Sequence, residues 1–166
     1  MTTGIRSARA VVALVACAVV LATGCSSGQP PASGPTAPGR PALAARYLAI
    51  AQPANRRLDA DFDGLDDHDH DDLHASAAYL RDAAATERRF DVQLLRLPLL
   101  PAMETVARLM AAANQSRALL TDQAAGSTSL AQLRGYEPRL TAANASVEEA
   151  VRVIRDQLGL PPPNSS

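Results

Sequence analysis

Residues 59–74 gather most of the side chains in this chain that could bind a metal ion. The stretch contains eight of the seventeen acidic residues and all three histidines. Carboxylate oxygens are the ligands that Ca²⁺ prefers, whereas imidazole together with carboxylate suits Zn²⁺ or Ni²⁺. The candidate metal ligands are Asp59, Asp61, Asp63, Asp67, His70 and His74.

The first half of this stretch, Asp59-x-Asp61-x-Asp63-Gly64, resembles the calcium loops of EF-hand and related Asp-rich repeat proteins. In those loops alternate carboxylates converge on one cation, and the glycine permits a sharp turn. The pattern departs at its twelfth position, where His70 stands in place of an acidic residue. The resemblance implies a Ca²⁺ site in which the chain turns at Gly64.

A second metal site is suggested by His70 and His74, which would lie one turn apart on a helix. Asp67 would share their face, and this donor set suits Zn²⁺ or Ni²⁺. A divalent cation is therefore the one cofactor that the sequence suggests.

The favoured interpretation of the same stretch is a solvated or arginine-paired charge run, because such runs usually face water. Leu58, Phe62, Leu65 and Leu73 keep helical spacing straight through it. Residues 59–72 are therefore expected to form either a loop between two helices or part of one long, highly charged helix.

The chain lacks the motifs of the common enzyme classes. It has no G-x-S-x-G nucleophile motif, no P-loop and no Rossmann glycine pattern, and none of its five glutamates belongs to a Glu-x-x-His pair. The sequence therefore predicts a protein that is not an enzyme. A formal net charge of −1 also argues against nucleic acid as a partner.

The first 24 residues have the plan of a secretory signal peptide. Arg6 and Arg9 precede an apolar run of thirteen residues at 10–22, which is shorter than the roughly 20 residues that span a bilayer. The run ends in Leu21-Ala22-Thr23-Gly24-Cys25, which resembles the lipobox of bacterial lipoproteins, although Ala22 stands where leucine is usual. The resemblance implies cleavage after Gly24, lipidation of Cys25 and attachment to the outer face of the cell membrane.

Two other interpretations of this segment remain open. The run could be an uncleaved membrane anchor, or the chain could be an ordinary secreted protein with a free cysteine. Cys17 also follows a lipobox-like pattern, but only residues 10–13 would then remain as the apolar part of the signal, so Cys25 is preferred.

Residues 25–41 are expected to be a flexible linker and 161–166 a disordered tail, because both are rich in proline and polar residues and poor in large apolar ones. Between them, residues 42–160 show the apolar spacing of helices and no alternation with period two. The fold class predicted is all-α, an antiparallel bundle of about four helices.

Prolines and glycines place the ends of these helices. Pro101 indicates a helix start, and Gly126 followed by hydroxyl residues indicates a stop and a new start. Pro138 predicts a break in the last apolar run, and Ser146-x-x-Glu149 has the pattern of a capping box. Glu137 and Asn144 interrupt the same run, and a polar residue there could either fix the register of the bundle or mark a helix break.

The charges of the chain are unevenly divided. Without Arg6 and Arg9 the chain keeps fourteen arginines, and none of them lies among the eight acids of 59–72, which leaves nine acids elsewhere. The predicted mature protein is a basic helical body with one acidic segment. We expect a lipoprotein with a non-enzymatic binding or scaffolding domain, whose protein or cell-wall partner is unknown, or else a lipoprotein that binds a divalent metal through 59–74.

Overall fold

The structure, a computed structural model, describes residues 38–67 and 72–163. Within these residues the chain is helical and forms no strand, which confirms the predicted all-α class. The helices in chain order are α1 (Arg40–Asp67), α2 (Leu73–Leu94), α3 (Pro101–Ala125), α4 (Leu130–Arg134) and α5 (Glu137–Leu158).

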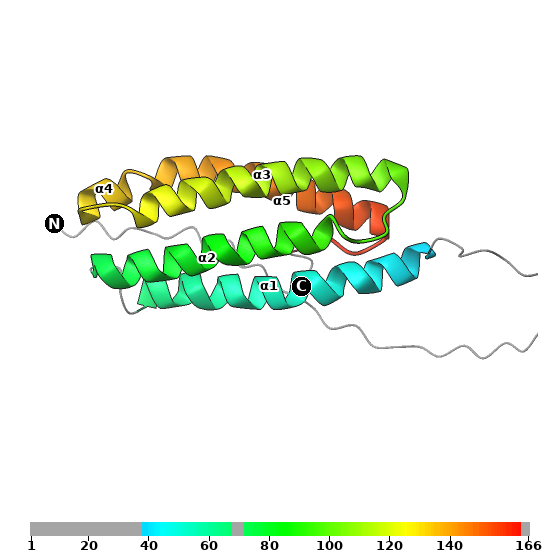
Figure 1. Cartoon of the computed structure of the whole chain (residues 1–166), viewed down its shortest axis with the longest axis horizontal. Coiled ribbons are helices and arrows are strands. Elements are labelled where there is room, and N and C mark those ends of the chain that lie inside the picture. The colour runs from blue at the N-terminus through cyan, green and yellow to red at the C-terminus, as the bar shows by residue number, and fades with distance from the viewer. Residues whose placement is uncertain (1–37, 68–71, 164–166) are drawn as a thin grey trace, which may run out of the picture.

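The four long helices form an antiparallel bundle of two layers, with α1 and α2 in one layer and α3 and α5 in the other (Figure 1). α1 packs against α2 and α5, and α3 packs against the same two helices. The start of α1, the turn at 95–100 and the end of α5 lie together at one end, which we call the Arg40 end (Figure 1). The opposite end carries the last residues of α1, 59–67, and the start of α2, and it is called the acidic end.

Most of the expected helix boundaries are confirmed. Pro101 occupies the first turn of α3, where its missing N–H costs nothing, and Gly126 caps the end of that helix. Ser129 caps α4 by accepting a hydrogen bond from the N–H of Gln132 at 3.2 Å. Pro138 lies in the first turn of α5, so the predicted break separates α4 from α5.

The capping box predicted at Ser146 and Glu149 is wrong, because both residues lie inside α5. That helix begins at Glu137, about three turns earlier than a cap at Ser146 would allow. It ends at Leu158 and is capped by Gly159 in a left-handed conformation with φ 70°. Pro53 lies inside α1, and the helix continues through it.

Large apolar side chains pack in the half of the bundle near the Arg40 end. Tyr47 of α1 meets Phe90 of α2 edge to face, with ring centroids 6.4 Å apart. Leucine, methionine and isoleucine side chains from all four long helices surround this pair: Leu43, Leu94, Met103, Met110, Ile154 and Leu158. Burial raises the pKa of Tyr47 to about 12, so its hydroxyl stays neutral in this core.

A second and smaller cluster lies toward the acidic end, where Ala77, Leu80, Ala124 and Ala125 are buried. Alanines bring helix backbones close together but bury little apolar area for each residue. The bundle is therefore held mainly at its Arg40 end. No helix of the described residues has the length and apolar character that crossing a bilayer requires.

Leu94→Ala should lower the free energy of unfolding by about 2–5 kcal/mol, because the side chain is fully buried and its removal leaves a cavity. The neighbouring Leu95 is 51 % exposed, so Leu95→Ala should change stability by no more than about 0.5 kcal/mol. Urea unfolding followed by circular dichroism measures both. Equal losses in the two variants would contradict the described packing.

Candidate functional site

The acidic residues of the predicted calcium loop lie on a helix. Asp59, Asp61 and Asp63 belong to α1, and Asp67 is its last residue. Successive residues of a helix are rotated by about 100°, so alternate side chains point to different sides and cannot converge on one ion as they do in a loop. The sequence left open whether residues 59–72 form a loop or a helix. Residues 59–67 are helical.

The sharp turn expected at Gly64 is wrong, and the glycine serves a different purpose. A Cβ atom added at Gly64 would lie 2.7 Å from the ring of Tyr79 on α2. Glycine therefore lets α1 and α2 approach closely at the acidic end. The helical spacing of Leu58, Phe62 and Leu65, rather than the calcium-loop pattern, describes the local structure.

The three aspartates have different surroundings. Asp61 faces the inside of the bundle and is only 5 % exposed, with its Oδ1 3.7 Å from Nε of Arg57. Arg57 also pairs with Asp82 of α2, which lies outside the acidic run, so this arginine links α1 to α2. Burial, followed by the charge of Asp82, raises the pKa of Asp61, and Arg57 partly opposes that rise.

Asp59 and Asp63 lie one turn apart on α1, where like charges repel. Burial raises the pKa of Asp59, and the Asp63 carboxylate adds to that effect. A cation between the two carboxylates would relieve the repulsion. Within residues 38–67 and 72–163, however, no three His, Cys, Asp or Glu side chains are grouped so that they could hold a metal ion.

The two histidines of the second predicted metal site are not both visible. His70 lies outside the described residues, whereas His74 is exposed in the first turn of α2. Asp72 caps that helix by accepting hydrogen bonds from the N–H groups of His74 at 2.8 Å and Ala75 at 3.1 Å. These backbone hydrogen bonds, that of Ala75 first, lower the pKa of Asp72.

Sequence reasoning missed a layer of polar side chains, buried at its centre and exposed at its edge, that crosses the middle of the bundle. We call it the polar layer, and it separates the two apolar clusters. Its members come from α2, α3 and α5: Glu87, Asp91, Asn114, Arg117, Asn144 and Glu148.

The centre of the polar layer is an ion pair between α2 and α3. Nε of Arg117 lies 2.8 Å from Oε1 of Glu87, whose side chain is 1 % exposed. Asn114 donates hydrogen bonds to Oδ1 of Asp91 at 2.9 Å and to the carbonyl of Glu87 at 3.3 Å. The same asparagine accepts a hydrogen bond from Nη2 of Arg117 at 3.0 Å.

Asn144 extends the layer to α5. Its Oδ1 accepts a hydrogen bond from Nη1 of Arg117 at 2.5 Å, and its Nδ2 donates to Oε1 of Glu148 at 2.6 Å. Asn144 is the one member that the sequence pointed to, because it interrupts an apolar run. Glu87 and Asp91 carried a similar signal, since they continue the helical stripe that contains Leu80 and Leu94.

Burial makes two carboxyl groups of this layer titrate near neutral pH. It raises the pKa of Glu87 to about 7 and that of Asp91 to about 6, while Arg117 partly opposes both shifts. Oε2 of Glu87 accepts no hydrogen bond from the described residues, so this oxygen can take up a proton without losing a partner. The layer can therefore bind protons at mildly acidic pH.

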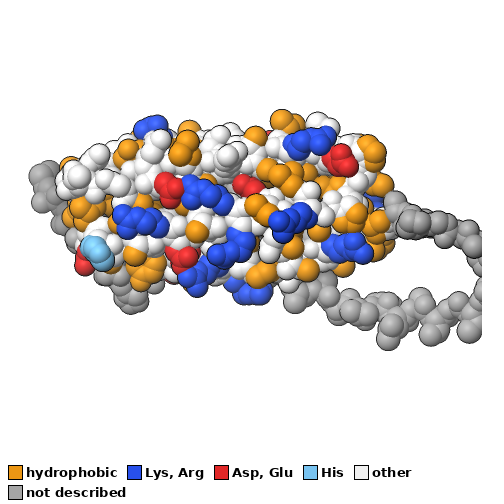
Figure 2. Space-filling model, viewed as in Figure 1, with side chains coloured by type: hydrophobic (Ala, Val, Ile, Leu, Met, Phe, Trp, Pro, Cys, Tyr) orange, Lys and Arg blue, Asp and Glu red, His pale blue; other side chains and the backbone are white. Residues whose placement is uncertain are grey.

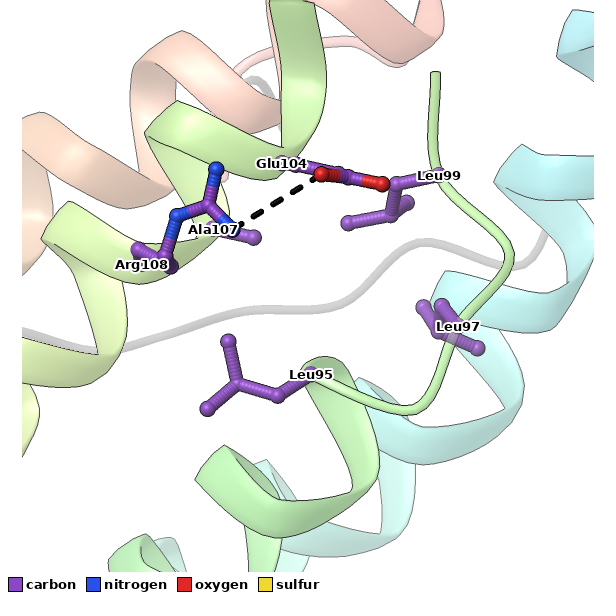
Figure 3. Close-up of a pocket in the computed structure, with 6 residues that line it drawn as sticks. All are labelled: Leu95, Leu97, Leu99, Glu104, Ala107 and Arg108. Atoms are coloured by element: carbon purple, nitrogen blue, oxygen red, sulfur yellow. Dashed lines mark ion pairs between the residues drawn. The ribbon is translucent and has the colours of Figure 1, made fainter. Parts of the chain in front are cut away.

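A small cavity lies at the Arg40 end, between the turn at 95–100 and the first turns of α3. Its volume is about 190 Å³. Figure 3 shows Leu95, Leu97 and Leu99 on one side and the ion pair of Glu104 with Arg108 on the other. Ligand pockets for small molecules usually have about 300–1,000 Å³, so this cavity suits one aliphatic group better than a whole cofactor.

The titration of Glu87 predicts a stability that depends on pH. Its pKa is about 7 in the folded protein against an ordinary 4.5, so the folded state binds the proton more tightly. The contribution of Glu87 to the free energy of unfolding should therefore fall by at most about 3 kcal/mol as the pH rises from about 4.5 to about 7, and Asp91, whose pKa is also raised, should add a fall that is complete near pH 6.

Urea unfolding at pH 5 and pH 8 measures this difference. Glu87→Gln should remove most of it, because the amide does not titrate. Glu148→Gln, which changes an exposed carboxylate of the same layer, should keep it. A wild-type protein that is equally stable at both pH values would contradict the assigned burial of Glu87.

Comparisons with known proteins find no relative of this chain. No protein-family model matches the chain, and no significant match is found among curated proteins or solved structures. A function for this chain must therefore be argued from its own residues.

Proposed function

We propose that this chain is a lipoprotein of the bacterial cell envelope, anchored through Cys25 on the outer face of the cell membrane. One observation carries the proposal: the order of Arg6 and Arg9, the apolar run at 10–22, and the Gly24-Cys25 pair. The proline-rich segment then continues up to Arg40, where α1 begins. This order agrees with a signal peptide, an anchor, a linker and a folded domain.

In this proposal the helical bundle is a non-enzymatic binding or scaffolding module for a protein or a cell-wall component. Large apolar side chains on the outside of α3 support a binding role, because Leu109 is 64 % and Leu119 is 56 % exposed. Single exposed leucines are common, but two on the outside of one helix supply apolar area to a partner.

Cys25→Ser should release the protein from the membrane, because the lipid chains would have no sulfur to attach to. Cys17→Ser is the matched control and should leave the protein in the membrane fraction, since Cys17 would lie in the discarded segment. Fractionation of cells with immunoblotting measures both. Mass spectrometry of the wild-type protein should show a diacylglyceryl group on Cys25.

Membrane attachment of the Cys25→Ser protein would show that residues 10–22 act as a true membrane span. An unmodified Cys25 in the wild-type protein would overturn the anchor directly. Either result would replace the lipoprotein with one of the two other interpretations of this segment.

An alternative function is the capture of a divalent cation by the acidic end. The observation that favours it is the repulsion between Asp59 and Asp63, because a bound cation would relieve it. Ca²⁺ and Zn²⁺ are the two candidates, with His70 and His74 as further ligands for Zn²⁺.

Calorimetric titration of the purified protein with each metal tests this alternative. Saturable heat with one metal is expected, and Asp59→Ala together with Asp63→Ala should abolish it, because these two carboxylates lie one turn apart on α1. Arg88 pairs with Asp122 away from the acidic segment, so Asp122→Ala serves as a control that should retain the signal. No saturable heat with either metal would exclude the alternative.

A further inference from the structure

The Arg40 end combines features that the two proposed functions do not use. The first described residues lead into α1 at this end (Figure 1). The Arg40 side chain lies next to Gly159, where a Cβ atom would be 3.7 Å from Cδ of the arginine, so the start of α1 meets the end of α5. Any chain that links Cys25 to the bundle must therefore arrive here.

Apolar side chains are exposed around this end. Val92 is 49 %, Leu95 is 51 % and Leu100 is 42 % exposed, and all three lie on or next to the turn between α2 and α3. The cavity behind Leu95 adds the half-buried Leu97 to this surface (Figure 3). The result is an apolar surface centred on one turn of the chain.

Exposed arginines that have no carboxylate partner among the described residues lie in the first two turns of α1, in the last two turns of α2 and in the turn at 95–100. Among the described residues, none of the following exposed arginines has an ion pair within 4 Å: Arg40, Arg46, Arg89 and Arg96. Among the acids nearby, Glu104 pairs with Arg108 and Glu149 pairs with Arg152, whereas Asp156 in the last turn of α5 is exposed, so the four arginines outnumber the one described acid there that has no ion pair. Figure 2 shows arginines spread among apolar side chains over the face formed by α2 and α3.

An anionic lipid surface fits both features, and the position of the linker favours it over other partners. Fourteen residues separate Cys25 from Arg40, so the bundle can move no further than about 50 Å from its anchor even when they are fully extended. The average distance of such a chain is nearer 20 Å, which keeps the Arg40 end at high effective concentration beside the bilayer. Arginine pairs with phosphate in a bidentate manner, and leucine enters the boundary between headgroups and acyl chains.

We propose that the Arg40 end is a membrane-contact surface, in which Leu95 and Leu100 enter the lipid interface and the four arginines bind phosphates of anionic phospholipids. The inference rests on the proposed lipid anchor at Cys25, which places this end of the bundle at the bilayer. The acidic end then points away from the membrane.

Fluorescence of the lipidated protein in vesicles tests this orientation. A fluorescent dye is attached to the new cysteine of the Leu95→Cys variant. The Leu119→Cys variant, labelled in the same way, is the matched control, because it replaces another exposed leucine nearer the acidic end. The vesicles contain phosphatidylcholine alone or phosphatidylcholine with phosphatidylglycerol, and a spin-labelled lipid serves as quencher. In the anionic vesicles the dye at position 95 should be quenched severalfold more than the dye at 119.

Charge variants show whether the arginines cause the contact. Each arginine near an anionic surface strengthens binding about fivefold, so Arg89→Gln with Arg96→Gln should return the quenching at position 95 almost to that of the control. Arg56→Gln with Arg134→Gln removes two exposed arginines nearer the acidic end and should leave the quenching unchanged. Circular dichroism confirms that each variant is folded.

The outcomes separate this inference from the lipid anchor. Equal quenching at 95 and 119 on vesicles that retain the protein would overturn the membrane-contact surface and leave the anchor in place. Quenching at 95 that is independent of phosphatidylglycerol would overturn the role of the arginines. A Cys25 that mass spectrometry finds unmodified would overturn both the anchor and the orientation.

Discussion

The burial of Glu87 is the constraint on which the alignment of the helices depends. A carboxylate that is 1 % exposed cannot remain charged without a partner, because removing it from water costs several kcal/mol. Arg117 of α3 is the nearest cation, and its remaining nitrogens need acceptors of their own, which Asn114 and Asn144 supply. The ion pair of Glu87 with Arg117 and the hydrogen bonds of Arg117 to the two asparagines thus connect α2, α3 and α5.

Such a layer specifies register more than it adds stability. Apolar side chains can slide past one another along a bundle at small cost, whereas a shift of α3 by one turn, about 5.4 Å, would leave Glu87 and Arg117 unpaired. α1 contributes no side chain to the polar layer. Its position is set instead by Tyr47 in the apolar core, by the close contact of Gly64 with Tyr79, and by Arg57.

Much of the fold could be predicted from the sequence because its signals are local. Pro101, Gly126 and Ser129 mark helix ends through their own backbone and hydroxyl chemistry, and the structure agrees with all three. Ser146 carries the same kind of signal but lies inside α5, because Pro138 begins the helix eight residues earlier. A capping pattern indicates a helix start only when no stronger signal precedes it.

The polar layer could not be predicted in the same way, because it depends on which helices become neighbours. Glu87 and Arg117 are thirty residues apart and belong to helices that face each other only in the bundle. Taken singly, charged residues are usually solvated, whereas Glu87 and Asp91 are buried. A better guide was their position, since both continue an apolar stripe of α2 in which solvent exposure is not expected.

The two ends of the bundle are far enough apart to act independently. α1 has 28 residues and is about 42 Å long, whereas electrostatic interactions in physiological salt decay over about 8 Å. The acidic residues at one end therefore do not weaken the attraction of the arginines at the other end to an anionic bilayer. If the bundle of the proposed anchored protein turned over, Asp59 and Asp63 would meet that bilayer and be repelled. The division of charge along the described helices thus favours the orientation that we propose for the anchored protein.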